Sequence, residues 1–153
     1  YFLQRFGAKE HFKLDYKPNF YGPYSGKVKY VINYLNGSYI MGYSSMDKKP
    51  FETLDLVSDG FEKVESYILS KPELVQIVNR TELFLDGFYS EFALELLSTV
   101  DYISLNKDTF DLEIIKSELE GWSERKRTLF SNDRFLNISI NHLRKHFGWY
   151  YDI

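Results

Sequence analysis

The amino-acid sequence predicts a mostly α-helical fold of the α+β class, a compact multi-helix domain with a small β element near its N-terminus. From residue 59 onward, apolar residues recur at intervals of three and four, which is the spacing of a buried helix face. Before residue 59, short extended segments lie between Gly, Pro and Asn residues, as is typical of strands joined by turns. At 153 residues, a single domain covering residues 1–153 is expected, because a chain of this length buries about 68–70% of its unfolded surface.

The first elements are predicted to be the end of a helix and a short strand. Residues 1–7 have the pattern of the last turns of a helix that ends at Gly7. In residues 12–16, apolar side chains then alternate with charged ones, which predicts a strand. Pro18 and the sequence Tyr21-Gly22-Pro23-Tyr24 are expected to end that strand, because Pro and Gly favour turns.

A helix and a small sheet are predicted next. Ser25 is expected to cap a helix with apolar residues at helical spacing, and Asn36-Gly37 is expected to end it. Residues 39–43 and 51–57 are then predicted as two extended segments on either side of a turn at 47–50. We expect these two segments to pair.

Four or five helices are predicted after residue 59. Two of their starts match the capping-box pattern, with Asp59 three residues before Glu62 and Ser70 three residues before Glu73. Gly148 is expected to end the last helix. The side chains expected to form the core are Leu74, Ile77, Val78, Thr81, Leu85, Phe92, Leu96, Leu97, Val100, Ile103, Leu112, Ile115, Leu119, Trp122, Phe135, Ile138, Leu143 and Phe147.

Charge is distributed unevenly along the chain. Residues 1–50 carry 8 basic and 3 acidic groups, residues 51–120 carry 5 and 16, and residues 121–153 carry 6 and 3. A concentrated negative charge attracts basic partners and repels nucleic acid, so the middle segment is expected to bind protein and not DNA. The alternative is that these carboxylates only cover solvent-exposed helix faces.

The absence of cysteine excludes thiol nucleophiles, thiolate zinc sites and disulfides, and it favours a cytoplasmic location. A membrane-spanning helix needs a run of about 18 apolar residues. The sequence contains none, so no membrane association is expected. His142 and His146 share a helix face, but Arg144 and Lys145 lie between them and would oppose a bound cation. We therefore expect solvated or capping histidines, no metal, no cofactor and no catalytic residue.

A basic and aromatic stretch covers residues 13–30. Lysines such as Lys17 could contact phosphates, and tyrosines such as Tyr21 and Tyr24 could stack on bases. Single-stranded nucleic-acid binding by this first third of the chain is therefore an alternative function. The competing interpretation is an ordinary amphipathic helix preceded by a turn.

Several motifs in order carry a family resemblance. Tyr21-Gly22-Pro23-Tyr24-Ser25 and the segment Gly37-Ser38-Tyr39-Ile40-Met41-Gly42-Tyr43 resemble the C-terminal domain of DarG-type antitoxins. Gly87-Phe88 and residues 94–100 look like that family's helix after a Gly-Phe turn. The resemblance spans nearly the whole chain, and the start is also similar to the Panacea antitoxin domain.

The resemblance implies a function without catalysis in this domain. DarG pairs with the toxin DarT, which attaches ADP-ribose to thymidine in single-stranded DNA, and an upstream macrodomain of DarG removes the modification. The chain is thus expected to be a fragment of a longer protein that binds a DarT-like toxin and occludes its DNA site. It is expected to be a monomer or a one-to-one heterodimer with the toxin in the bacterial cytoplasm, and not to bind nucleic acid directly.

The resemblance also directs attention to one set of side chains. Tyrosine supplies a large rigid contact area at low entropic cost, so the tyrosines of the motifs are expected to anchor the partner. The glycine and proline between them are expected to shape the loop. The predicted partner-binding residues are Tyr21, Gly22, Pro23, Tyr24, Tyr39 and Tyr43.

Overall fold

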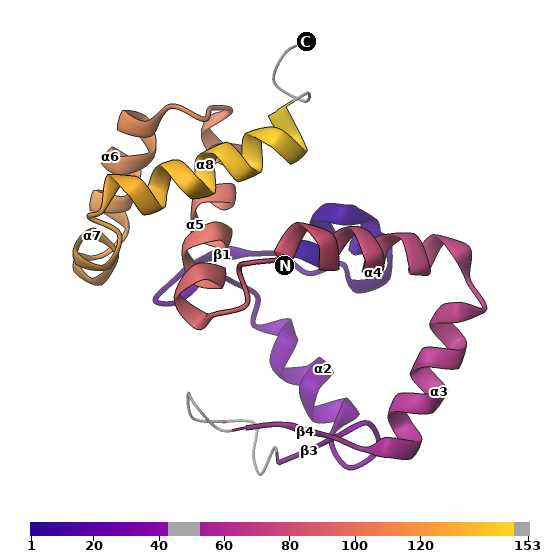
Figure 1. The fold of residues 1–153 in the computed structure, drawn as a ribbon. Coiled ribbons are helices and arrows are strands. Elements are labelled where there is room, and N and C mark those ends of the chain that lie inside the picture. Colours follow the sequence, from indigo (N-terminus) through magenta and orange to yellow (C-terminus); the bar gives the residue numbers. More distant parts are fainter. Residues whose placement is uncertain (43–52, 149–153) are drawn as a thin grey trace. The chain divides into compact units, whose positions relative to one another are not determined.

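The structure, a computed structural model, describes residues 1–42 and 53–148 (Figure 1). It is mostly helical with two small antiparallel sheets, which confirms the predicted fold class. The described elements are η1 Gln4–Ala8, α1 Lys9–Phe12, β1 Lys17–Asn19, β2 Gly22–Tyr24, α2 Lys27–Leu35, β3 Ile40–Met41, β4 Asp55–Leu56, α3 Ser58–Leu69, α4 Pro72–Leu85, α5 Glu91–Lys107, α6 Leu112–Trp122, α7 Glu124–Leu129 and α8 Asp133–Phe147.

Internal contacts divide the chain into two compact units. Unit 1 combines residues 1–2 and 16–24 with the chain from residue 82 onward. Unit 2 consists of residues 3–15 and 25–81. A single domain covering residues 1–153 stays a prediction.

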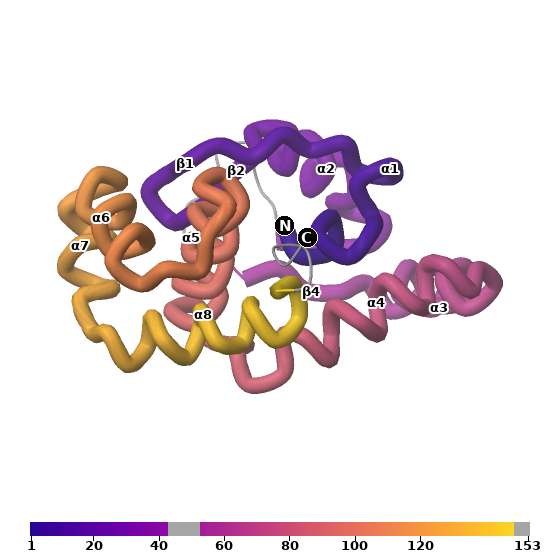
Figure 2. The backbone as a smooth tube through the Cα atoms, turned by 90° about the horizontal axis from the view of Figure 1, so that it is seen from above, coloured from indigo at the N-terminus to yellow at the C-terminus, as the bar shows by residue number. Residues whose placement is uncertain are grey.

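Unit 1 is built around α5, which packs against α8, α6 and the hairpin β1–β2 (Figures 1 and 2). Removing apolar side chains from water stabilises such an arrangement by about 25 cal/mol per Å². The predicted stripe of α5 is buried except for Phe92, which is half-buried. In α8 the predicted face is partly wrong, because Phe135 and Ile138 are exposed and Leu136 and Ile140 are buried instead. The buried apolar side chains of unit 1 are Phe2, Phe84, Leu96, Leu97, Val100, Ile103, Ile115, Leu119, Phe130, Leu136, Ile140, Leu143 and Phe147.

Side-chain caps fix the starts of four helices in unit 1. Each capping side chain accepts a hydrogen bond from a backbone N–H of the first turn, which typically contributes about 1 kcal/mol. Gly148 ends α8 as predicted. The capping residues are Ser90 for α5, Asp111 for α6, Ser123 for α7 and Asn132 for α8.

The first predicted strand is wrong. The chain stays helical beyond Gly7, whose φ of +121° interrupts the helix without ending it, and α1 continues to Phe12. The observed strand begins at Lys17 and contains Pro18, opposite Pro23. Antiparallel strands alternate between hydrogen-bonded and non-hydrogen-bonded pairs, and two facing prolines suit the second kind because neither has an N–H to donate.

Unit 2 contains α2, α3 and the predicted two-stranded sheet. β3 and β4 pair antiparallel, with Ile40 opposite Leu56, so the expected pairing of the two extended segments is confirmed. The predicted turn at 47–50 lies outside the described residues. Gly60 of α3 passes close to the chain after α2, since a Cβ there would lie 2.5 Å from the Ser38 carbonyl oxygen.

The predicted N-terminal caps of unit 2 are wrong, whereas Asn36 ends α2 as predicted. Gly26, and not Ser25, precedes α2, and Val57 precedes α3, in both cases without a side-chain cap. Ser70 ends α3, where its hydroxyl donates to the Tyr67 carbonyl at 2.7 Å. Since Asp59 already lies inside the first turn of α3, its carboxylate complements the helix dipole and does not cap the helix.

Six helices lie within residues 58–148 of the described structure, more than the four or five predicted, because Ser123 alone separates α6 from α7. Its φ and ψ of −169° and 157° are extended and break the helical path for one residue. In the described parts of the chain, no helix has the length and apolar character needed to cross a membrane.

Candidate functional site

The hairpin β1–β2 lies on α5 because Gly22 allows a close approach. Gly22 has a φ of +112°, a backbone conformation that residues other than glycine rarely adopt. A Cβ at this position would lie 3.2 Å from Thr99 Oγ1 and 3.4 Å from Ser98 Oγ. The motif predicted as a partner-binding loop is therefore also a packing element.

Long-range hydrogen bonds hold the hairpin and its flanks. Trp122 Nε1 donates to the Asn19 carbonyl oxygen at 2.9 Å. The Tyr102 hydroxyl donates to the Tyr16 carbonyl at 3.4 Å. Two segments of unit 1, α5 and the end of α6, thus hold the two sides of the hairpin.

A buried ion network lies between α5 and α7. The Lys126 side chain is 0% exposed, and its Nζ lies 2.5 Å from Glu95 Oε1 and 3.2 Å from Thr99 Oγ1. Arg125 forms a two-pronged pair with the same carboxylate, through Nη1 to Oε1 and through Nη2 to Oε2 at 3.0 Å. One carboxylate therefore binds two adjacent cations.

The environment of this network changes the proton affinities of its members. Burial alone would raise the pKa of Glu95, but hydrogen bonds from Arg125 and Lys126 outweigh it and leave that pKa below its ordinary value. Burial lowers the pKa of Lys126, and the hydrogen bond and charge of Glu95 oppose that effect. The hydrogen bond to Glu95 raises the pKa of Arg125. The low pKa of Glu95 makes it a structural anion, not a proton donor.

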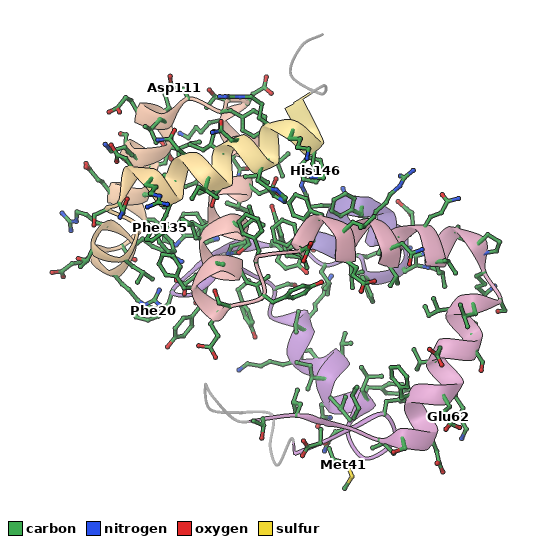
Figure 3. The ribbon with its side chains drawn as sticks, in the orientation of Figure 1. Phe20, Met41, Glu62, Asp111, Phe135 and His146 are labelled. Atoms are coloured by element: carbon green, nitrogen blue, oxygen red, sulfur yellow. The ribbon has the colours of Figure 1, made fainter. Side chains whose placement is uncertain are left out.

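Two aromatic rings stand at the tip of the hairpin. Phe20 and Tyr21 are 52% and 51% exposed, and their rings meet edge to face with centroids 4.9 Å apart. The Arg125 guanidinium carbon lies 5.1 Å from the Phe20 ring centroid and 5.0 Å from that of Tyr21. Figure 3 shows Phe20 beside α7.

A surface pocket adjoins this tip. Its volume is about 560 Å³, and its walls are mostly apolar. The lining residues are Phe20, Ser123, Glu124, Arg125, Thr128 and Leu129. A smaller hollow of about 170 Å³ on the hairpin itself is lined by Asn19, Tyr21, Gly22, Pro23 and Tyr24.

The structure gathers four of the six predicted partner-binding residues in one hairpin and assigns a fifth to unit 2. Tyr21, Gly22, Pro23 and Tyr24 share one hairpin in unit 1. Tyr39 is half-buried in unit 2, where its carbonyl accepts from the Val57 N–H at 3.0 Å. Tyr43 lies outside the described residues.

Sequence reasoning missed Phe20 and Glu95 as members of the site. Phe20 directly precedes the recognised motif, so the position of the turn was the available signal. Glu95 shows no such signal, because its spacing from Arg125 reflects packing of α5 on α7 and not a local pattern.

The two histidines on α8 are half-buried, so neither is fully solvated, and His146 lies in the last turn of the helix. His142 Nε2 lies 2.7 Å from the Phe84 carbonyl oxygen, and its ring packs against Phe84 and Phe88. His146 packs against His142 with centroids 4.7 Å apart. Burial lowers the pKa of both histidines. Among the described residues, no group of three or more His, Cys, Asp or Glu could hold a metal ion.

Comparisons with known proteins find relatives that carry the name of one enzyme. No family model matches the chain. The chain is 27% identical over 128 residues to a DNA ADP-ribosyl glycohydrolase of Thermus aquaticus. This alignment covers 84% of the chain and 34% of that protein. It is 21% identical over 126 residues to proteins of the same name from Mycobacterium bovis and Mycobacterium tuberculosis, covering 79% of this chain and 36% of each. The chain thus spans about a third of the length of these relatives.

These relatives correct three expectations. Their name is that of a glycohydrolase, which is an enzyme, and not that of a toxin-binding antitoxin. The identification as a toxin-binding C-terminal domain of the DarG type was therefore wrong, and so were the expected inhibition of a toxin and the expected absence of enzymatic function. The broader part of the resemblance is supported, because the chain is similar to a protein whose name refers to ADP-ribosyl groups.

Proposed function

We propose that this protein takes part in the removal of ADP-ribosyl groups from DNA. The observation that supports this is the similarity to DNA ADP-ribosyl glycohydrolases along 79–84% of the chain. In such a reaction water cleaves the glycosidic bond, so that ADP-ribose gains the hydroxyl group and the DNA gains the proton. A cytoplasmic location, where DNA and NAD-derived modifications occur together, belongs to the same proposal.

The geometry of unit 1 suits a substrate-binding role in that reaction. Most glycoside hydrolases place a pair of carboxyl groups beside the bond that breaks. Glu95 does not fit this task, because Arg125 and Lys126 occupy its carboxylate beneath the hairpin. We assign Glu95 to positioning the hairpin, whose exposed tip and adjoining pocket face solvent.

The test is a hydrolysis assay on a DNA oligonucleotide that carries one ADP-ribosyl group. The protein in its full natural length should return the oligonucleotide to its unmodified mass and release free ADP-ribose. A protein substrate that carries ADP-ribose serves as the comparison and should be processed more slowly. An oligonucleotide that keeps its modification at equimolar protein would overturn the proposal.

A further inference from the structure

The helices α2 and α3 of unit 2 lack the packing that stabilises helices in unit 1. Among the described residues of unit 2, Ala8 is the one apolar side chain that is buried, whereas unit 1 buries 13. Neither α2 nor α3 packs extensively against another helix of the described chain. Isolated helices shorter than about 12–15 residues are marginal in water, and α2 and α3 have 9 and 12 residues. Both helices therefore need a further surface to cover them.

α2 has apolar side chains on two of its sides. One side, which contains Val28 and Ile32, is half-buried. On another side Tyr30, Val31 and Tyr34 are exposed, and their spacing places them on one face. A helix that is apolar on more than one side is typical of a buried position. The exposed face of α2 therefore has the composition of an interface.

α3 exposes a similar row of side chains. Phe61, Val64 and Tyr67 follow one another at intervals of three residues, so they lie along one side of the helix. A buried Phe or Tyr covers about 150–250 Å², so the four rings of α2 and α3, which are 48–83% exposed, present roughly 400–600 Å². One partner of a standard protein interface contributes about 800 Å². These rings alone supply half of that area or more.

The two helices carry opposite charges. α2 contains Lys27 and Lys29 and no carboxylate, which gives a net charge of +2. α3 contains three carboxylates and Lys63, which gives a net charge of −2. Lys27 also pairs with Asp15 at 3.4 Å, but both side chains are exposed, and such pairs contribute little. The charges of α2 and α3 are thus complementary to each other.

This charge pattern selects a second copy of the chain as the occupant. A uniformly acidic partner would be repelled by α3, and a uniformly basic one by α2. In a two-fold symmetric pair each surface meets the same surface of the other copy, so α2 can lie on α3 twice. Figure 1 shows that α2 and α3 leave the sheet β3–β4 in different directions, so the two helices of one copy do not cover each other.

We propose that two copies of this chain form a two-fold symmetric dimer in which α2 of each copy packs on α3 of the other. The exposed rings form the apolar centre of this interface, and the lysines and carboxylates form its rim. The inference does not rest on the proposed function, because the surface belongs to unit 2, whereas the hairpin tip and its pocket belong to unit 1. It differs from the expected monomer.

The molecular mass in solution tests the dimer. Protein of full natural length is studied by sedimentation equilibrium from about 1 to 100 µM, a range that covers weak and moderate association. The mass should rise from that of one chain to that of two. Amide hydrogen exchange in α2 and α3 should slow over the same range, because association stabilises the elements that it covers. Exchange in α5 should not change.

A substitution of one ring tests the apolar centre. Tyr34 is 83% exposed, so Tyr34→Ser should leave the helix content in circular dichroism unchanged. It should raise the dissociation constant about a hundredfold, because an interface tyrosine contributes about tenfold and a two-fold interface loses it twice. Tyr89→Ser is the matched control, since Tyr89 is an exposed ring of unit 1, and it should leave the dissociation constant unchanged.

Charge inversion tests the pairing of α2 with α3. Lys27→Glu with Lys29→Glu gives α2 a net charge of −2, and Glu62→Lys with Glu65→Lys gives α3 a net charge of +2. Each double variant alone should associate at least about tenfold more weakly, because like charges then meet at both contacts. An equimolar mixture of the two variants has opposite charges at both contacts. It should dimerise about as tightly as the wild type.

Several results would overturn the dimer. These are a single-chain mass at about 100 µM, equal association of wild type and Tyr34→Ser, and no rescue in the mixture of two folded variants. Protection of α2 and α3 in a monomer would show that another part of the same chain covers them. Protection that requires another protein or a nucleic acid would identify that molecule as the occupant. None of these results affects the proposed function, which the hydrolysis assay tests separately.

Discussion

Lys126 is a fully buried lysine, and Glu95 supplies the opposite charge it requires. An ammonium group removed from water loses several kcal/mol of hydration, which a close carboxylate and a hydroxyl partner offset. In the sequence, Lys126 stands between Arg125 and Arg127, a run typical of an exposed helix face. Its burial follows from the packing of α7 on α5, and a local pattern could not indicate it.

Replacement of Glu95 by Gln should destabilise the protein by about 3–5 kcal/mol at neutral pH, because it leaves a buried cation without its anion. The low pKa of Glu95 means that this stabilisation is present above the ordinary value of 4.5 and is lost as pH falls through the folded-state pKa. The difference between wild type and variant should therefore shrink in acid. Denaturant unfolding at several pH values measures it.

Glu91→Gln is the matched control, since Glu91 is an exposed carboxylate one turn earlier on α5. It should change the free energy of unfolding by no more than about 0.5 kcal/mol. A loss in Glu95→Gln as small as this, or one independent of pH, would show that the network does not stabilise the fold.

Residue-level patterns predicted much of the core but not always the correct face. In α8 apolar side chains occur at 135, 136, 138 and 140, so two neighbouring stripes satisfy helical spacing. Packing against α5 buries the stripe that contains Leu136 and Ile140 and leaves Phe135 exposed. The periodicity correctly predicts the helix, while the choice of face depends on the neighbouring element.

At the scale of elements, the hairpin β1–β2 depends on one glycine. Gly22→Ala should destabilise the protein by about 1–3 kcal/mol, because a φ of +112° is strained for alanine and its Cβ would press on Thr99. Thermal unfolding measures the loss.

Gly121→Ala provides the comparison for this glycine. Gly121 lies within α6, and a Cβ there would meet no atom within 4 Å. Alanine favours the helix, so this variant should gain up to about 1 kcal/mol. Equal effects of the two substitutions would mean that the close approach of the hairpin to α5 is unimportant.

Local sequence signals predicted the hairpin turn but not its strands. The residues Tyr21-Gly22-Pro23-Tyr24 were expected to form a turn, and Tyr21 does lie in it, whereas Gly22, Pro23 and Tyr24 form β2. Pro18 was expected to follow a strand, but it lies within β1. A two-residue hairpin tolerates proline at pairs without hydrogen bonds. Whether such a pair exists depends on register, and the register here depends on contacts with α5.

At the scale of the whole molecule, the two units differ in how much they bury. In unit 1, α5 has seven buried residues, whereas α3 in unit 2 has one, Gly60. Regions with few buried apolar contacts open at lower free energy. We therefore expect amide hydrogens of α3 to exchange faster than those of α5. The free energy of local opening should be lower in α3 by about 2 kcal/mol or more.

Hydrogen exchange followed by mass spectrometry checks this difference, with peptides from α8 as a second reference for unit 1. Equal protection of α3 and α5 would mean that the chain opens only as one cooperative unit. The fold class was predictable at this scale because it depends on periodicity. The division into units was not, because it arises from pairings between residues distant in sequence, such as Tyr1 with Asp101.

The hydrogen bond from Trp122 to Asn19 has a consequence for synthesis on the ribosome. Its partners are 103 residues apart, so at about 5–20 residues per second the acceptor is synthesised about 5–20 s before its donor. During translation the nascent hairpin therefore lacks the helices that support it. Unit 1 can fold only after most of the chain has left the exit tunnel, and its aromatic tip is meanwhile accessible to chaperones.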